Sequence, residues 1–300
     1  MDNKKFLKID ELINVIKNKG ITISNDQKTK LILKDNNYYV VMGYKTVFKK
    51  NGNYKSNVNF EDIYKIYQFD NKLKHILLEA MLNAESLMKT HITNYFSNKY
   101  GYTEKDYLDK NNYNYNHYHI DETLTDMKNQ IYNNMESNKA LNHYSVKYKF
   151  IPLWVANKVF TFGLIKNTYL CMKDIDKLNI MKEITDDSKI ATKDFGTFLR
   201  IMVAFRNRAA HNAIVYNEFA NNIWVSRNRE HNRFDTKFGR NDLLAVLIAL
   251  KYILNKDTFN EVLDEISILI DKTLKDINSI TKDDLLKEMH LPNNYEILKW

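Results

Sequence analysis

The chain has 300 residues, of which 44% are hydrophobic, 7 are glycine and 2 are proline. This length permits one large domain or a domain with a smaller appendage, and the scarcity of turn-forming residues disfavours a fold of many short strands. The single cysteine excludes an internal disulfide, and the net charge of +8 favours polyanionic partners, although charge alone does not establish contact with RNA. We expect an all-α protein.

The hydrophobic segments of the sequence indicate in which compartment the protein is located. Residues 1–5 are not followed by the apolar run of a signal peptide. The longest apolar run, residues 243–250, is too short to cross a bilayer as a helix and predicts a buried core helix instead. A lone cysteine also fits a reducing compartment. We therefore expect a cytoplasmic protein that does not contact a membrane.

The first sixty residues contain two predicted helices and an extended segment. Residues 5–19 repeat apolar side chains at helical spacing and stop at Gly20, and a second short helix is expected over residues 25–33. Residues 36–44 are rich in tyrosine and valine, which predicts a short strand or an extended connector. The Asn-Gly-Asn sequence at residues 51–53 predicts a turn.

A long amphipathic helix follows. Over residues 60–98 an apolar stripe continues for many turns, which predicts one long helix or two nearly collinear ones. Residues 100–118 lose this period and predict a long loop. Further helices are expected over residues 122–137, 140–148, 152–170, 194–215, 241–254, 258–277 and 282–289.

Residues 206–211 place an arginine, an asparagine and a histidine near the end of one of these helices. In a helix Asn207 and His211 face the same way, while Arg206 is offset by roughly 140° and can reach the same cleft with its long side chain. Histidine titrates near neutral pH, and arginine grips phosphate with a planar fork. RNA cleavage without a metal requires these residue types: a base for the 2′-hydroxyl, an acid for the leaving 5′-oxygen and a cation for the phosphorane.

One motif supplies only one histidine, whereas this chemistry uses both an acid and a base. Two copies of the motif that meet across a symmetric helix pair would supply both, so the chemistry predicts a homodimer. The pattern of an arginine, four residues and a histidine is common in basic helices. By itself it does not distinguish a catalytic pair from solvated surface residues.

Arg206-Asn207 followed by His211 resembles the catalytic motif of HEPN ribonucleases, and its surroundings resemble the Abi-like abortive-infection proteins of bacteria, the AbiD/AbiF group. Matching segments run in order through nearly the whole chain, and together they are more specific than any one of them. They are Tyr38-Tyr39, Gly43-Tyr44, residues 60–64, Tyr67, Phe69-Asp70, Leu77-Leu78, Glu85, residues 87–90, Pro152-Leu153-Trp154, Phe162-Gly163, residues 205–212 and residues 291–294.

The resemblance implies an all-α HEPN-type helical bundle over residues 60–277. A helical segment with a short extended connector (1–59) would precede it, and a short helix with a tail (278–300) would follow. It implies an endoribonuclease toxin of anti-phage defence that needs no metal or other cofactor and leaves a 2′,3′-cyclic phosphate. Arg206 and His211 would carry cleavage. The implied partners are an RNA substrate, a second copy of the chain and, as in the AbiF branch, a regulatory non-coding RNA.

Three further positions qualify this resemblance. Asn212 stands where the family often has a second histidine, and Arg208 stands where an apolar residue is common. Glu85 matches an acidic position on the family's long helix and falls on or beside the apolar stripe, where an unpaired carboxylate would be costly. We therefore predict that Glu85 orients Arg206 or His211.

Predicted RNA contacts lie around the motif and in the polar, basic segment 217–240, which is expected to be a loop or hairpin with interleaved aromatic residues. The candidates are Lys89, Arg208, Arg227, Arg229 and Arg233. A solvated surface cation is the alternative interpretation of each. Asn207 can equally bond a facing helix instead of RNA.

For two other patterns we favour a structural interpretation over a functional one. His117 and His119 with Asp121 can be read as metal ligands, but no second cluster supports them and a solvated loop is the better interpretation. Cys171 is expected to be a buried, inert thiol. Two other functions stay open: a HEPN-like module that grips RNA or a partner without cutting, and a protein that neutralises a toxin encoded beside it.

Overall fold

The computed structural model describes residues 5–185 and 190–300. Residues 1–4, on which part of the signal-peptide argument rests, and residues 186–189 lie outside the described residues. In the described ranges the only strands are the two-residue β1 (Lys49–Lys50) and β2 (Asn53–Tyr54), so the predicted all-α class is confirmed. No described helix combines the length and apolar character that a membrane span requires.

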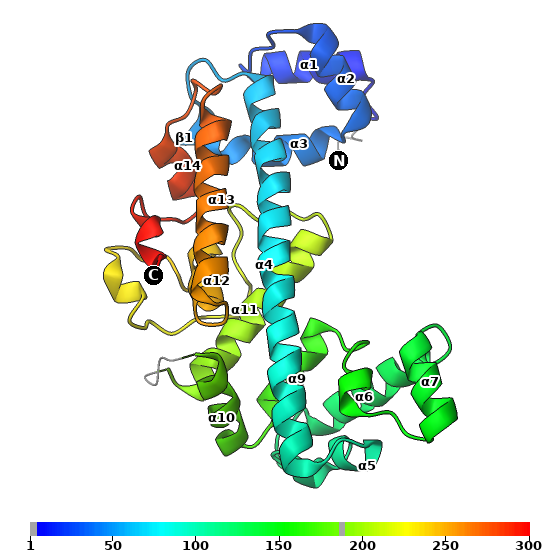
Figure 1. Ribbon diagram of the computed structural model, residues 1–300. Helices are drawn as coiled ribbons and strands as arrows, with labels where there is room; N and C mark the ends of the chain where they lie inside the picture. Colours follow the sequence, from blue (N-terminus) through cyan, green and yellow to red (C-terminus); the bar gives the residue numbers. More distant parts are fainter. Residues whose placement is uncertain (1–4, 186–189) are drawn as a thin grey trace.

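One helix, α4 (Phe60–Tyr100), runs through most of the length of the molecule (Figure 1). Its 41 residues include no glycine or proline, so nothing interrupts a rod of about 60 Å. The Asn59 side chain caps its start by accepting from the N–H of Glu61. The helix ends at Gly101, whose φ of +103° suits glycine. The prediction of continuous helix over residues 60–98 is confirmed in its single-helix form.

The first elements gather at the upper end of α4 in Figure 1. They are α1 (Ile9–Asn18), α2 (Asp26–Asp35), α3 (Tyr38–Met42), the 3-10 helix η1 (Gly43–Phe48) and the hairpin β1–β2, which turns at residues 51–52, within the predicted turn 51–53. The prediction of a strand or extended connector at residues 36–44 is wrong, because this segment forms α3 and the start of η1. Asn37 caps α3, and Tyr38, Val41 and Met42 bury one helical face, so packing overrides strand preference.

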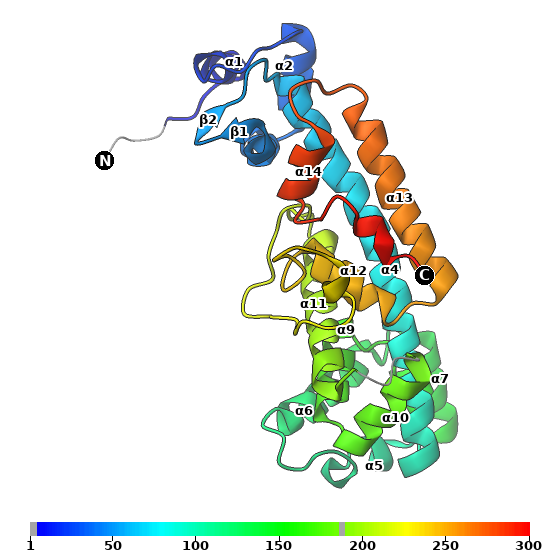
Figure 2. The ribbon, with the colours of Figure 1, turned by 90° about the vertical axis from the view of Figure 1, so that its left-hand side faces the viewer.

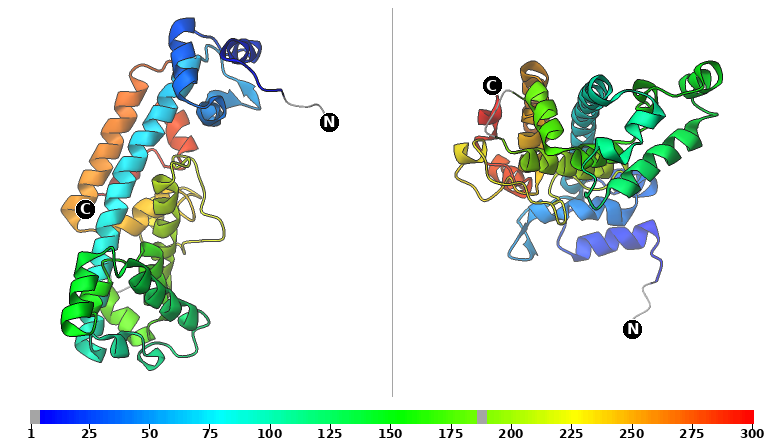
Figure 3. Two further views of the ribbon diagram at one scale, coloured as in Figure 1. Left: turned by 90° about the vertical axis from the view of Figure 1, so that its right-hand side faces the viewer. Right: turned by 90° about the horizontal axis from the view of Figure 1, so that it is seen from below.

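Seven short elements surround the lower end of α4, and Figure 3 shows α6 and α7 (green) projecting to one side. The segment 100–118, expected to be a long loop, contains two short helices, α5 and η2. The single helix expected from Pro152 is divided into two, because Thr161 caps a new helix. Helix α10 has no counterpart among the predicted elements. The seven are α5 (Glu104–Tyr107), η2 (Lys110–Asn112), α6 (Ile120–Asn134), α7 (Lys139–Tyr148), α8 (Leu153–Ala156), α9 (Phe162–Cys171) and α10 (Asp174–Ile184).

Helix α11 (Thr192–Ala210) packs against α4, α9 and α12 (Leu243–Lys251) and positions the candidate motif. It ends at Ala210, earlier than the expected residue 215. Helix α13 (Lys256–Leu274) runs along α4, as Figure 2 shows, and α14 (Lys282–Glu288) and η4 (Tyr295–Leu298) follow. The expected loop at residues 217–240 is present and contains the 3-10 turn η3 (His231–Arg233).

A continuous hydrophobic core joins these elements. Every residue of α12 is buried, as predicted for the apolar run 243–250. The core also includes Ile13, Leu77 and Leu298, which come from the three segments predicted as separate parts of the chain. The division at residues 59 and 277 stays a prediction.

Candidate active site at the end of helix α11

The segment that follows Arg206 ends α11 in a defined way. Asn212 adopts a left-handed φ of +54°. Its N–H donates to the carbonyl of Ala209 at 3.2 Å, and the N–H of Ala213 donates to the carbonyl of Arg208 at 3.0 Å, which is the bond pair of a Schellman helix ending. Asparagine adopts this conformation more readily than most residues with a side chain. The sequence therefore stops the helix just after His211.

His211 and Asn207 are exposed at this helix end. Among the described residues, the imidazole of His211 has no hydrogen-bond, ion-pair or aromatic partner. The side-chain oxygen of Asn207 accepts a hydrogen bond from Arg206 at 3.3 Å. The ring nitrogens of His211 are therefore accessible to a bound molecule.

Glu85 of α4 lies against the arginine of the motif. Its carboxylate is 3.7 Å from the guanidinium of Arg206 and 2.9 Å from the ammonium of Lys89. The Glu85 side chain is only 9% exposed, yet one of its carboxylate oxygens and the Nε of Arg206 are buried without a hydrogen-bond partner. Buried polar groups seldom stay unpaired, and hydrogen bonds in active sites often tighten only when substrate binds. The contact predicted between Glu85 and Arg206 is present, and its orienting role stays a proposal.

A second ionic cluster, around Asp70 of α4, anchors the chain just after the motif. The buried Asp70 carboxylate accepts from the hydroxyl of Tyr44 at 2.7 Å and from the backbone N–H groups of residues 215 and 216 at 3.2 and 2.8 Å. It also pairs with Lys74 at 3.0 Å, and Lys74 donates to the side-chain oxygen of Asn212 at 3.0 Å. Burial and the neighbouring carboxylate raise the pKa of Tyr44, which keeps its hydroxyl protonated.

Sequence reasoning assigned no role to the Asp70 cluster. A signal was available, because Asp70 and Lys74 are charged residues within the apolar stripe formed by Phe69, Leu73 and Leu77. Charges at such positions require polar partners from elsewhere in the fold. The same signal identified Glu85.

The predicted RNA contacts are dispersed. Lys89 is engaged with Glu85, and Arg208 forms an ion pair with Glu218. The other three, Arg227, Arg229 and Arg233, lie in the loop between α11 and α12, where Arg227 donates to the carbonyl of Thr236 and Arg233 pairs with Glu230. The structure thus brings Glu85, Lys89, Arg206 and Asn207 together and separates the loop arginines from them. Their contacts with RNA stay predictions.

Arg233 belongs to an ionic cluster within that loop. It pairs at 2.8 Å with the buried Glu230, which also pairs with the buried Lys251 of α12 at 3.0 Å. Burial alone would raise the pKa of Glu230, but the hydrogen bonds from Arg233 and Lys251 outweigh burial and lower this pKa below its ordinary value. The cluster holds the loop against the core.

His117, His119 and Asp121 do not form a metal site. In residues 5–185 and 190–300 no group of three histidine, cysteine, aspartate or glutamate side chains is placed to hold a metal ion. His119 and Asp121 each pair with another side chain, and His117 lies 3.3 Å from the sulfur of Cys171. Burial raises the pKa of the Cys171 thiol, in agreement with the predicted buried, inert cysteine.

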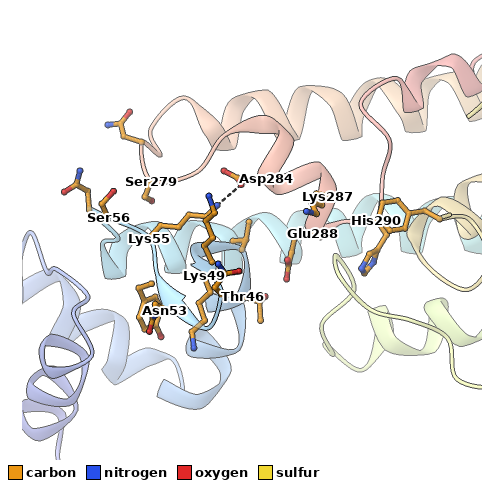
Figure 4. A pocket seen from close by; sticks show the side chains of 17 residues that line it. Thr46, Lys49, Asn53, Lys55, Ser56, Ser279, Asp284, Lys287, Glu288 and His290 are labelled. Carbon is orange, nitrogen blue, oxygen red and sulfur yellow. Dashed lines mark ion pairs between the residues drawn. The ribbon is translucent and has the colours of Figure 1, made fainter. Parts of the chain in front are cut away.

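A wide hollow lies between the β1–β2 hairpin and α14 (Figure 4). Its volume is about 1090 Å³, and Lys55 of the hairpin pairs with Asp284 of α14 at 2.7 Å. None of the predicted catalytic or RNA-binding residues lines it. Four lysines and two carboxylates line it, and one lysine of the four is neutralised by the pair between Lys55 and Asp284.

The sequence profile of the family described as Abi-like protein matches residues 31–217, which is more than half of the chain. The matched region includes Asp70, Glu85 and the whole of the segment 206–211. No match was found among curated proteins or among solved structures.

Proposed function

Because the chain belongs to the Abi-like protein family, we propose that it is a HEPN-type endoribonuclease that acts in bacterial abortive-infection defence by cleaving RNA in the cytoplasm. The observation that carries this proposal is the unpartnered imidazole of His211, exposed at a helix end five residues after Arg206. Glu85 supports the proposal, because its carboxylate lies 3.7 Å from the guanidinium of Arg206 and the oxygen at that distance accepts no hydrogen bond.

The proposed reaction is an internal phosphoryl transfer. A neutral imidazole takes the proton of the RNA 2′-hydroxyl, and the 2′-oxygen attacks the adjacent phosphorus. The bond from phosphorus to the 5′-oxygen breaks, and a protonated imidazole donates to that oxygen. The products are a 2′,3′-cyclic phosphate and a 5′-hydroxyl. The guanidinium of Arg206 stabilises the charge on the phosphorane, and no step calls for a metal ion.

A second copy of the chain supplies the second imidazole. One protomer offers a single His211, whereas the reaction uses a base and an acid. A symmetric dimer in which the two copies meet at the ends of α11 would bring two motifs to one scissile phosphate.

The test compares the wild type with His211→Ala and Arg206→Ala on single-stranded RNA in the presence of EDTA. We expect the wild type to cleave and each variant to lose at least about 100-fold in rate, as removal of a general acid or base does. His75→Ala is the matched control, because His75 is an exposed histidine of α4 outside the motif. Equal activity of His211→Ala and the control would contradict the proposal.

A non-catalytic RNA-binding module is the second candidate, and the net charge of +8 favours it. The same assay separates the two. Retention of RNA without products by both the wild type and His211→Ala would support binding alone. Sequencing of RNA that copurifies with Arg206→Ala from a bacterial host would identify a bound substrate or regulatory RNA.

A further inference from the structure

A basic hollow lies on the far half of α11 from His211. Its volume is about 400 Å³, and it lies between α10, the first half of α11 and residues 222–224 of the following loop. Its lining includes Lys177 of α10, Lys193 and Arg200 of α11, and Trp224 of the loop. Trp224 is one of the aromatic residues interleaved in the basic segment 217–240, and in the structure it lines this hollow together with cations from α10 and α11.

The cations of this hollow are largely free. Lys177 pairs with Asp174 at 2.8 Å, but Lys193 and Arg200 form no ion pair within the described residues. Their effect extends to a neighbour, since burial first, and then the charges of Lys177, His119 and Arg200, lower the pKa of His117. Uncompensated cations around a concave surface attract phosphate groups.

Trp224 supplies an aromatic surface at the same place. It is 61% exposed, so its ring is accessible to a ligand that enters the hollow. The next residue, Val225, is buried, and its N–H donates to the carbonyl of Arg240 at 2.7 Å. The guanidinium of Arg240 lies 6.0 Å from the indole centre. The loop therefore holds Trp224 in place, so that a base can stack on it without first ordering the side chain.

The hollow and the motif share one exposed face of α11. Lys193, Arg200, Asn207 and His211 are exposed and recur at intervals of seven, seven and four residues, which keeps them within a narrow angular stripe of a helix. From Arg200 to His211 the helix rises by roughly 16 Å. A single RNA strand that follows this stripe would place a flanking nucleotide in the hollow while its scissile phosphate lies at His211.

We propose that this hollow is a nucleotide-binding subsite for the single-stranded RNA substrate, in which Lys193 and Arg200 bind a phosphate and Trp224 stacks on a base. The inference rests on the proposed ribonuclease function, because the strand it positions is the one cut at His211.

The binding test uses His211→Ala, so that RNA is not consumed, and fluorescence anisotropy of a labelled single-stranded oligonucleotide. We expect Trp224→Ala in this background to weaken binding by about tenfold and Trp224→Phe to restore most of it, because phenylalanine retains a stacking face. Trp154→Ala is the matched control, since Trp154 is 46% exposed but does not line the hollow. Equal binding by Trp224→Ala and Trp154→Ala would overturn the proposal.

A charge test addresses the phosphate contact. In the same background, Lys193→Gln is expected to reduce the slope of log affinity against log salt by about 0.7, which corresponds to one lost phosphate contact on a single strand. Lys182→Gln, an exposed lysine of α10 outside the hollow, is expected to leave the slope unchanged. An unchanged slope for Lys193→Gln would contradict the subsite.

The outcomes separate this inference from the proposed function. If the wild type cleaves RNA but Trp224→Ala cleaves with the same KM and kcat, the subsite is wrong and the ribonuclease stands. If binding depends on Trp224 and Lys193 but the wild type never cleaves, the subsite stands and the ribonuclease is wrong. Thermal unfolding of Trp224→Ala and Trp224→Phe excludes a loss of fold as the cause.

Discussion

Two ionic clusters connect α4 to the end of α11, and they differ in how fully their polar atoms are paired. Around Asp70, both carboxylate oxygens accept hydrogen bonds, and Lys74 reaches across to Asn212. Around Glu85, one carboxylate oxygen and the Nε of Arg206 are buried without a hydrogen-bond partner. Both clusters lie on the same helix and both are shielded from solvent.

The difference separates support from function. A buried charge that is fully paired and hydrogen-bonded holds two segments in a fixed relation. A buried charge with an unpaired atom stays energetically unfavourable until a further group binds. Asp70 therefore fixes where the chain goes after His211, and we propose that Glu85 holds Arg206 for a substrate phosphate.

Removal of Asp70 should cause the largest loss of stability. Asp70→Ala leaves Lys74 as a buried, unpaired charge and frees the backbone N–H groups of residues 215 and 216, so we expect a loss of about 3–5 kcal/mol in the free energy of unfolding. Urea denaturation measures it. Glu79→Ala is the control, because Glu79 is exposed on the same helix. A loss below about 1 kcal/mol would show that the cluster is not the anchor described.

Removal of the Glu85 charge should change the free energy of unfolding only slightly but should lower the rate of RNA cleavage strongly. Glu85→Gln keeps the side-chain shape but no longer draws Arg206 into place, and a misplaced catalytic group costs about 10- to 100-fold in rate. Cleavage assays and urea denaturation on the same preparation measure both effects. Unchanged cleavage would mean that Glu85 does not orient Arg206.

The helix ending at Asn212 offers a finer comparison. Asn212→Ala and Asn212→Gly both lose the hydrogen bond from Lys74, but only alanine meets steric strain at a φ of +54°. The alanine variant should be less stable than the glycine variant by about 1–2 kcal/mol. Equal stabilities in thermal unfolding would show that the left-handed turn is not maintained in solution.

The smallest expected effect is a pH dependence in the loop before α12. Burial lowers the pKa of His231, whose neutral ring can accept from the N–H of Asn228 at 3.1 Å and donate to the carbonyl of Gly239 at 2.6 Å. The folded state therefore binds a proton less readily than the unfolded state. The contribution of His231 to stability is complete above the ordinary histidine pKa and is lost as pH falls toward the lowered value.

Unfolding measured at about pH 7.5 and about pH 5.5 tests this dependence. We expect the wild type to lose stability at the lower pH and His231→Gln to lose less. His75→Ala, at an exposed site, should follow the wild type. A steeper fall for His231→Gln than for the wild type would contradict the neutral, buried ring.

Much of the fold follows from local sequence, and the exceptions have physical causes. The stripe from Phe60 onward predicted α4 because no glycine or proline interrupts it. The tyrosines and valines of residues 38–42 predicted a strand, but burial of one helical face and the Asn37 cap decided for a helix. Such a choice depends on what the segment packs against, which its own residues do not specify.

The candidate site was predictable in part for a similar reason. Arg206, His211 and Glu85 carry a local pattern or stand out as charges in or beside an apolar stripe. The hydrogen bonds between Asp70 and residues 215 and 216 join positions about 145 apart and arise only when α4 and α11 meet. The basic hollow is lined by side chains from α10, α11 and the loop after α11, so the sequence of any one of these segments does not predict it.

Mixed dimers of the wild type with His211→Ala test most directly the claim that two copies of the motif form one active site. The proteins are co-expressed with different tags, and activity is measured against the fraction of wild-type chains. If each site needs both imidazoles, activity falls as the square of that fraction, to about one quarter at equal amounts. A linear fall to about one half would mean that each protomer cuts alone, and would contradict the composite site.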